Sequence, residues 1–202
     1  MSWIDYLVEP YLNYTSMEIL LESIAMLTGI LSVYFAKKDN ILVFPTGLIS
    51  TGLYVWICAR VLLYADAGIN AYYFIMSIYG WNIWSQAEAG RNTKKIESMA
   101  YRDKYILLLG SIFSFALIAS ILFFFTDSDV PFIDALTTTI FFGAMWLMAR
   151  KKIEHWALWI TADAISIPLY IYKGLGITSI QYLVFLGLAI AGLISWRKKM
   201  CV

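Results

Sequence analysis

The chain has 202 residues, of which 61% are hydrophobic and 14% are charged, with a net charge of +1 and a mean hydropathy of +0.71. Soluble domains are nearer half apolar and a quarter charged, so this composition excludes a soluble globular domain and predicts one compact unit embedded in a membrane. The two cysteines, Cys58 and Cys201, are too few for a disulfide framework.

Residues 1–16 are aromatic and acidic and lack the basic start and the cleavage site of a secretory signal, so we predict a short interfacial segment. Seven spanning helices are predicted after it, at residues 19–36, 41–59, 61–84, 105–125, 132–149, 155–172 and 177–196. Residues 37–40 should form a tight loop, and Pro45 should make the second span kinkable. Residues 85–104 are predicted to form a polar loop with a short helix on the membrane surface.

Lysine and arginine are distributed unevenly between the two sides of this arrangement. All but two of the 15 fall in the first, third and fifth connections or at the C-terminus, and only Arg60 and Lys173 fall on the other side. Because loops rich in Lys and Arg stay in the cytoplasm, we predict an N-terminus outside and a C-terminus in the cytoplasm.

Four pairs of similar segments, spaced by 114, 116, 111 and 112 residues, indicate an internal repeat. They are Lys37-Lys38 with Lys151-Lys152, Leu53-Tyr54 with Leu169-Tyr170, Gly68–Asn70 with Ser179–Gln181, and Trp84 with Trp196. We predict an all-α membrane fold of seven helices in a 3+1+3 arrangement, with two parallel three-helix repeats. The first repeat would span residues 17–84 and the second residues 132–202, with a loop and a linking helix at residues 85–131. Such repeats usually hold a substrate site between them.

One face of the third span carries a polar and aromatic stripe. Its members recur at steps of three or four residues, which places them on one side of a helix: Asp66, Asn70, Tyr73, Ser77, Trp81 and Trp84. A stripe of this kind is unfavourable in lipid, so we predict that it faces a cavity or a helix contact inside the bundle. Asp66, one turn into the span, is interpreted as a rim or helix-start residue.

The sixth span presents a matching face, and Asp163 is its most informative residue. A carboxylate at that depth costs roughly 3 kcal/mol to insert, and no Lys, Arg or His lies at mid-depth to pair with it. We therefore predict a bound organic cation as its partner, with Trp and Tyr rings adding cation–π attraction of about 1–2 kcal/mol each. The predicted substrate-binding residues are Asn70, Tyr73, Ser77, Trp81, Trp84, Trp159, Asp163, Ser166, Tyr170 and Gln181.

Other interpretations of these residues stay open. Asp163 could instead be protonated or bonded to backbone in a helix contact, and Asn70 and Gln181, taken singly, also fit interhelical hydrogen bonds. The alternative near the basic connections is the membrane interface, with Trp81, Trp84 and Trp196 as belt aromatics and His155 as a solvated side chain. The sequence offers no metal or cofactor site and no catalytic arrangement, so we do not expect an enzyme.

The segment from Gly29 to Trp84, with the motifs LYAD and YGWNIW, resembles the first half of the Pnu-type bacterial vitamin transporters, the PnuC family. The segment ARKKIEHWALWITADAISIPLYIYKG resembles their sixth-span region. The resemblance implies a seven-span homotrimer in the bacterial inner membrane, with a small-molecule vitamin bound in the middle of each protomer. It also implies facilitated diffusion, made one-way by phosphorylation of the vitamin inside the cell.

The resemblance also bears on the substrate, because members of this family carry nicotinamide riboside, thiamine or riboflavin. The nicotinamide riboside carriers commonly have Gln at the position of Asn70 and Asn at the position of Asp163, and those amides suit a carboxamide. The carboxylate of Asp163 can instead balance the thiazolium cation of thiamine or accept from its amine. The resemblance therefore favours thiamine, with nicotinamide riboside, also a cation, as the alternative. Riboflavin is neutral and gives Asp163 no role.

A protein of another class is a further alternative, namely the vitamin-binding subunit of an ATP-driven transporter. The internal repeat and the odd number of spans argue against it. We expect no ion coupling, because no ion site is apparent in the spans. We also expect no nucleic-acid partner, because membrane topology explains the basic residues.

Overall fold

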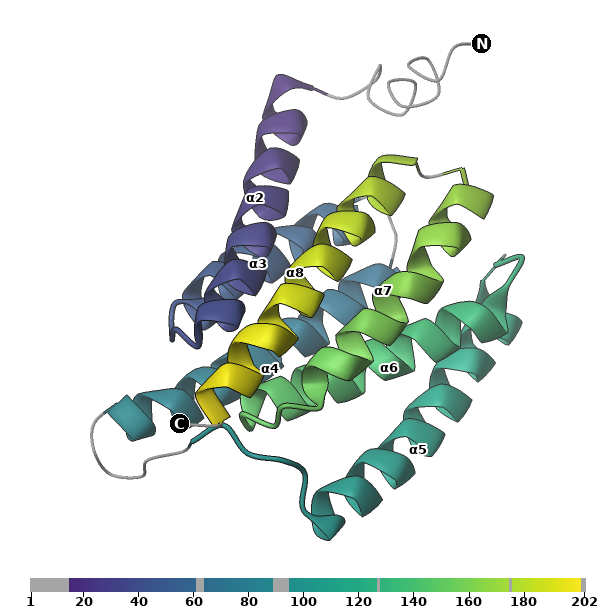
Figure 1. Ribbon diagram of the computed structural model, residues 1–202. Helices are drawn as coiled ribbons and strands as arrows, with labels where there is room; N and C mark the ends of the chain where they lie inside the picture. Colours follow the sequence, from purple (N-terminus) through teal and green to yellow (C-terminus); the bar gives the residue numbers. More distant parts are fainter. Residues whose placement is uncertain (1–14, 61–63, 89–94, 127, 175, 201–202) are drawn as a thin grey trace.

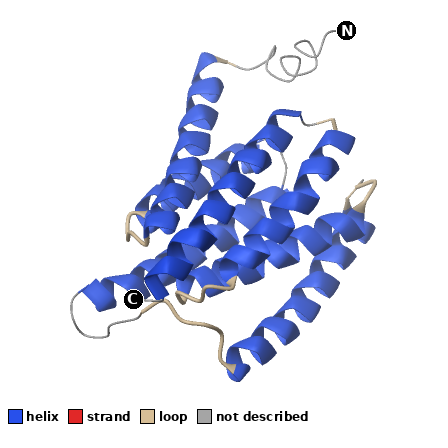
Figure 2. Ribbon diagram, in the orientation of Figure 1, coloured by secondary structure: helices blue, strands red, loops and turns tan. Residues whose placement is uncertain are grey.

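The computed structural model describes residues 15–60, 64–88, 95–126, 128–174 and 176–200 (Figure 1). The predicted interfacial segment at residues 1–16 lies outside the described residues except for Thr15 and Ser16. Cys201 also lies outside them. Within the described ranges the regular structure is helical apart from one isolated bridge between Glu97 and Lys152 (Figure 2).

The prediction of seven helices is confirmed in the described part of the chain. They are α2 (Ser16–Lys38), α3 (Val43–Arg60), α4 (Tyr64–Glu88), α5 (Tyr101–Phe125), α6 (Pro131–Ala149), α7 (His155–Tyr172) and α8 (Gly176–Met200). The sixth predicted span matches α7 at both ends, and the other ends differ by up to four residues. Helix α2 starts earlier than predicted because Thr15 and Glu18 form a capping box, in which the Thr15 backbone N–H donates to Glu18 Oε2 at 2.8 Å.

Three local predictions about the connections are wrong. Lys37 and Lys38 belong to the last turn of α2, where basic side chains favour the negative end of the helix dipole, and the chain turns at Asp39 with φ 58°. Pro45 lies in the first turn of α3, where its missing N–H costs nothing, so it does not kink the span. No separate surface helix is present in the described part of residues 85–104, because α4 continues to Glu88 and residues 95–100 are extended.

Four helices are long and apolar enough to cross a membrane by length and composition: α2, α5, α6 and residues 178–200 of α8. The remaining three, α3, α4 and α7, supply most of the polar residues around the central cavity described below, which lowers their hydropathy. Helix α5 is the most exposed of the seven, with Phe113, Phe124 and Phe125 at least 70% exposed, as expected of a lipid-facing helix.

The helices pack in two groups joined through α5. Helices α2, α3 and α4 pack in sequence, as do α6, α7 and α8, while α5 packs against α6 (Figure 1). Across the two groups, α2 contacts α8 and α4 contacts α6, so the first helix of each group lies against the last helix of the other. This reciprocal packing supports the 3+1+3 division, which stays a prediction.

Candidate functional site

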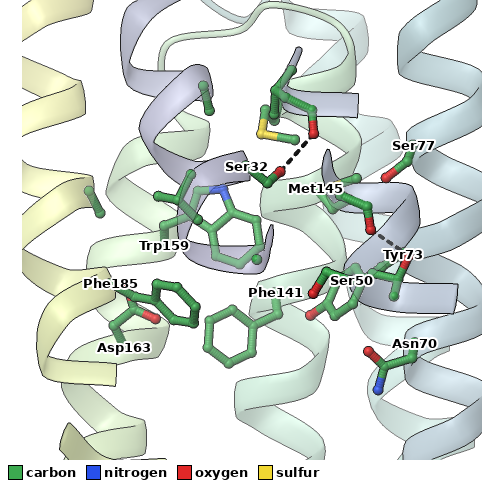
Figure 3. Close-up of a pocket in the computed structure, with 18 of the residues that line it drawn as sticks. Ser32, Ser50, Asn70, Tyr73, Ser77, Phe141, Met145, Trp159, Asp163 and Phe185 are labelled. Carbon is green, nitrogen blue, oxygen red and sulfur yellow. Dashed lines mark hydrogen bonds between the residues drawn. The ribbon is translucent and has the colours of Figure 1, made fainter. Parts of the chain in front are cut away.

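A cavity of about 220 Å³ lies between the two groups of helices (Figure 3). Its described lining comes from α2, α3, α4, α6, α7 and α8. The two sides differ in character, with small residues on α2 and α3 and large aromatic residues on α6, α7 and α8. The volume suits one small molecule, since it falls below the roughly 300–1,000 Å³ that is typical of drug-sized ligands.

The small-residue side is held together by hydroxyl groups that are already in use. Ser32 Oγ donates to the carbonyl of Val43 at 2.7 Å, and Ser50 Oγ donates to the carbonyl of Ala25 at 2.7 Å. A Cβ atom on Gly29 would lie 2.9 Å from Ser50 Oγ, so α2 approaches α3 this closely only because glycine occupies that position. These hydroxyls fix the wall and are not free to bind a ligand strongly.

The aromatic side is a chain of neighbouring rings. Trp159 lies 6.5 Å from Tyr73 and 5.4 Å from Phe141, measured between ring centroids, and Phe141 stacks on Tyr182 at 5.8 Å. Phe185 completes this side of the cavity. Ring faces with a negative quadrupole attract cations as well as flat apolar groups.

Asp163 is the one acidic side chain among the described lining residues, and no Lys, Arg or His is among them. The residue is only 1% exposed, and its Oδ1 atom has no hydrogen-bond partner among the described residues. A buried carboxylate oxygen without a partner costs free energy unless a ligand, water or proton satisfies it. Asp163 and the aromatic rings around it therefore form a site suited to a cation (Figure 3).

Two amide side chains lie apart from Asp163 on other helices. The Asn70 Nδ2 group donates to the carbonyl of Asp66 at 2.9 Å, which leaves the Oδ1 atom of Asn70 as the group that can accept from a ligand. Gln181 lines the cavity from α8, and both amides are partly exposed. The cavity can thus offer a carboxylate and amide groups to one bound molecule.

Six of the ten predicted binding residues line the cavity: Asn70, Tyr73, Ser77, Trp159, Asp163 and Gln181. The structure places the other four elsewhere. Trp81 is 40% exposed, Trp84 is buried among aromatic rings at one end of the bundle, Ser166 is buried one turn from Asp163, and Tyr170 stacks on Tyr182 at 5.0 Å. No measurement here tests substrate contact, which stays a prediction for all ten.

Several lining residues were not predicted, among them Tyr54, Phe141, Met145, Tyr182 and Phe185. A helical spacing signal exists for some of them, since Phe141 and Met145 are four residues apart on α6 and Tyr182 and Phe185 are three apart on α8. Those faces are wholly apolar or aromatic, so they read as ordinary core until the cavity is seen.

The two interface assignments for His155 and Trp196 are wrong. Both residues are 0% exposed, and each makes a hydrogen bond inside the protein: Nδ1 of His155 lies 2.7 Å from the carbonyl of Lys152, and Nε1 of Trp196 donates to the carbonyl of Ala36 at 2.9 Å. We call this part of the bundle the basic end, defined by Lys37 and Lys38, Arg150 to Lys152, and Arg197 to Lys199.

The extended segment at residues 95–100 is attached to the basic end through Lys152. Lys152 Nζ lies 2.9 Å from Glu97 and 3.1 Å from Asp103, and Arg150 lies 3.0 Å from Asp103. Burial alone would lower the pKa of Lys152, but the hydrogen bonds and charges of Glu97 and Asp103 outweigh it, so its pKa is raised. These contacts hold α5 and the segment before it against the connection between α6 and α7.

Comparison with known proteins identifies the kind of bundle that this is. Residues 19–198 match the family model described as "Nicotinamide mononucleotide transporter". The chain belongs to this family. It is therefore a membrane transporter, and the resemblance to the Pnu-type family seen in the sequence is confirmed.

Individual members of the family extend the likeness over most of the chain. The nicotinamide riboside transporter PnuC of Escherichia coli (strain K12) is 22% identical, with 87% of this chain and 84% of that protein covered. The nicotinamide riboside transporter PnuC of Neisseria mucosa is 28% identical, with 88% and 72% covered. A crystal structure of the vitamin B3 transporter PnuC matches with a TM-score of 0.71 at 25% identity, covering 98% of this chain and 90% of that one.

Proposed function

We propose that this chain carries a small cationic aromatic vitamin across the bacterial inner membrane, with nicotinamide riboside as the first candidate. The observation that carries the proposal is the unpaired Oδ1 atom of Asp163 in a cavity lined by Trp159, Tyr73, Phe141 and Tyr182. The pyridinium ring of nicotinamide riboside is flat and positively charged, so it can lie between these rings and near the carboxylate. Its carboxamide nitrogen can donate to the Oδ1 atom of Asn70.

The choice of nicotinamide riboside over other vitamins rests on the relatives, because both of the PnuC proteins compared above are named as nicotinamide riboside transporters. Thiamine is the second candidate, and Asp163 is the observation that favours it. A carboxylate can accept a hydrogen bond from the exocyclic amine of thiamine as well as balance its thiazolium charge. Riboflavin is neutral and would leave the buried carboxylate unpaired.

The remaining features of the proposed transporter follow from its charges and its family. The basic end faces the cytoplasm, because basic connections stay on that side, and the N-terminus lies outside. Transport is facilitated diffusion, with phosphorylation of the vitamin inside the cell as the trap, and the working unit is a homotrimer. We expect no catalytic step within the chain and no coupled ion.

Binding measured by calorimetry on the purified chain separates the two substrates. Nicotinamide riboside and thiamine would be titrated side by side, with riboflavin as the neutral comparison. Nicotinamide riboside tighter by tenfold or more, which is about 1.4 kcal/mol, supports the first candidate. Thiamine tighter by the same margin would replace it with the second, and measurable binding of riboflavin alone would contradict the role of Asp163.

A further inference from the structure

The basic end of the bundle is closed by two matching sets of three residues, one from each group of helices. In each set an aromatic residue near a helix start packs on a glycine, and a tryptophan lies one turn beyond that glycine. A Cβ atom on either glycine would overlap the facing ring, so both positions require glycine for this packing. The sets are Phe44, Gly80 and Trp84, and Trp156, Gly192 and Trp196, with each pair of counterparts spaced by 112 residues.

The two tryptophans cross between the groups and bind helix ends. Trp84 Nε1 on α4 donates to the carbonyl of Ala149, the last residue of α6, at 3.2 Å. Trp196 Nε1 on α8 donates to the carbonyl of Ala36 in the last turn of α2 at 2.9 Å. The carbonyl groups at the end of a helix lack intrahelical partners, so each indole fills a vacancy in the opposite group. The rings of Trp84 and Trp196 lie 6.2 Å apart, and both residues are at most 2% exposed.

An ion-pair layer lies next to the indoles and also joins the two groups. Asp39 and Lys151 are counterparts at the same spacing of 112 residues, and both have a left-handed backbone, with φ 58° and 55°. Lys151 Nζ lies 3.0 Å from Asp39 and 4.2 Å from the centre of the Trp84 ring, and Lys199 lies 3.7 Å from Asp39. The charges at positions 39 and 151 are opposite, so the two equivalent turns attract each other.

The two ends of the cavity differ in burial. At the basic end the lining residues next to the indoles, such as Ala36, Met148 and Ala189, are at most 6% exposed. Toward the other end Tyr54, Asn70 and Gln181 are partly exposed. The described residues therefore seal the cavity at the basic end, and a bound molecule could leave there only if the two groups separate.

We propose that these cross-group contacts are the cytoplasmic gate of the transporter, with the Trp84 and Trp196 hydrogen bonds as its inner layer and the Asp39–Lys151 ion pair as its outer layer. Release to the cytoplasm requires both layers to break together, because they join the same two groups. The gate rests on the proposed function in one respect, namely that the cavity is the transport path.

Accessibility of a single cysteine on the cavity side of the gate tests this proposal without any substrate. Ala189→Cys is introduced into the chain with Cys58→Ala and Cys201→Ser, and a membrane-impermeant methanethiosulfonate is added to inside-out or right-side-out vesicles. Trp84→Phe and Trp196→Phe remove an N–H donor but keep an aromatic ring. Each should raise the labelling rate from the cytoplasmic side by about tenfold, within the range that one hydrogen bond contributes.

Two controls separate opening of the gate from general loosening. Trp81→Phe, one turn from Trp84 on the same helix but 40% exposed, should leave the rate unchanged. A cysteine introduced by Ala135→Cys, at a fully buried position of α6, should stay unlabelled in every variant. An unchanged rate in both tryptophan variants, or equal labelling at position 135, would overturn the proposal.

The outer layer is tested by exchanging its charges. Asp39→Lys and Lys151→Asp each place like charges in the two turns and should raise the labelling rate, whereas the double variant restores an opposite pair and should return the rate toward that of the parent. A double variant as reactive as the single variants would remove the ion pair from the gate. Because no substrate is present, failure of vitamin binding would leave this result intact, and failure of the gate would leave the binding result intact.

Discussion

The charge of Asp163 is the feature on which the proposed substrate class depends, and Asp163→Asn removes it with almost no change in shape. The side chain is buried and its Oδ1 atom is unpaired in the empty cavity. A cation bound in the cavity would be its nearest opposite charge, since no basic residue is among the described lining residues. The substitution should therefore weaken binding of any cationic vitamin.

The size of the loss follows from the separation and the surroundings. Two unit charges about 5 Å apart interact by roughly 3 kcal/mol at an effective dielectric constant near 20. Part of this is offset because the free carboxylate no longer has to be desolvated in the variant. A net loss of about 1.5–3 kcal/mol remains, which corresponds to a Kd raised by roughly 10- to 150-fold.

Calorimetry on the purified variant measures this change directly, with Asp129→Asn as the matched control. Asp129 is an exposed acid in the connection between α5 and α6 and should not affect the Kd. The carriers that this chain resembles commonly have Asn and Gln at positions 163 and 70, so the double variant Asp163→Asn with Asn70→Gln should regain nicotinamide riboside but not thiamine. A single variant that binds both cations as tightly as the parent would refute the charge argument.

Three further predictions concern the aromatic wall, the attachment of α5 and the energy source. Trp159→Leu should raise the Kd for a cationic vitamin by about 5- to 30-fold through lost cation–π attraction, whereas Trp81→Leu should not, as measured by the same titration. Lys152→Met leaves the Asp103 carboxylate with only Arg150 beside it and should lower the free energy of unfolding by about 2 kcal/mol, seen as a lower Tm in detergent. An unchanged Tm would show that this contact is not stabilising. Imposed proton or sodium gradients should leave the uptake rate unchanged, and stimulation by either would reveal a coupled ion.

Much of the fold could be predicted because a bilayer restricts what a chain can do. Runs of about 18–25 apolar residues between polar connections predicted all seven helices, and the ends were missed only where capping or the dipole extended them, as at Thr15 and Lys38. Pro45 was misjudged because its cost depends on its place in the helix, and the start of α3 is not visible in an apolar segment.

The candidate site could be predicted in part, and the part follows from polarity. Asn70, Tyr73 and Asp163 stand out because a polar group within a span needs a reason, and the structure brings them to one cavity. Phe141 and Tyr182 do not stand out, because an aromatic residue in a span is unremarkable until its neighbours are known. The pairings between the two halves were also blurred, since short similar segments suggested spacings of 111 to 116 where the packed rings share 112.

The errors at His155 and Trp196 have one cause. Each lies next to basic residues and near the end of a helix, which is where interface residues are found. Their burial depends on contact between helices from opposite groups, such as α2 with α8, and no local pattern in the sequence encodes that contact.

Uptake into liposomes that contain only the purified chain tests the central claim most directly. Radiolabelled nicotinamide riboside and thiamine would be supplied outside, without ATP and without an ion gradient. The account predicts that one of these cations enters until its concentrations inside and outside are equal, and that Asp163→Asn slows entry at low substrate concentration. No entry of either cation, or entry only when an ATP-driven partner is added, would contradict it.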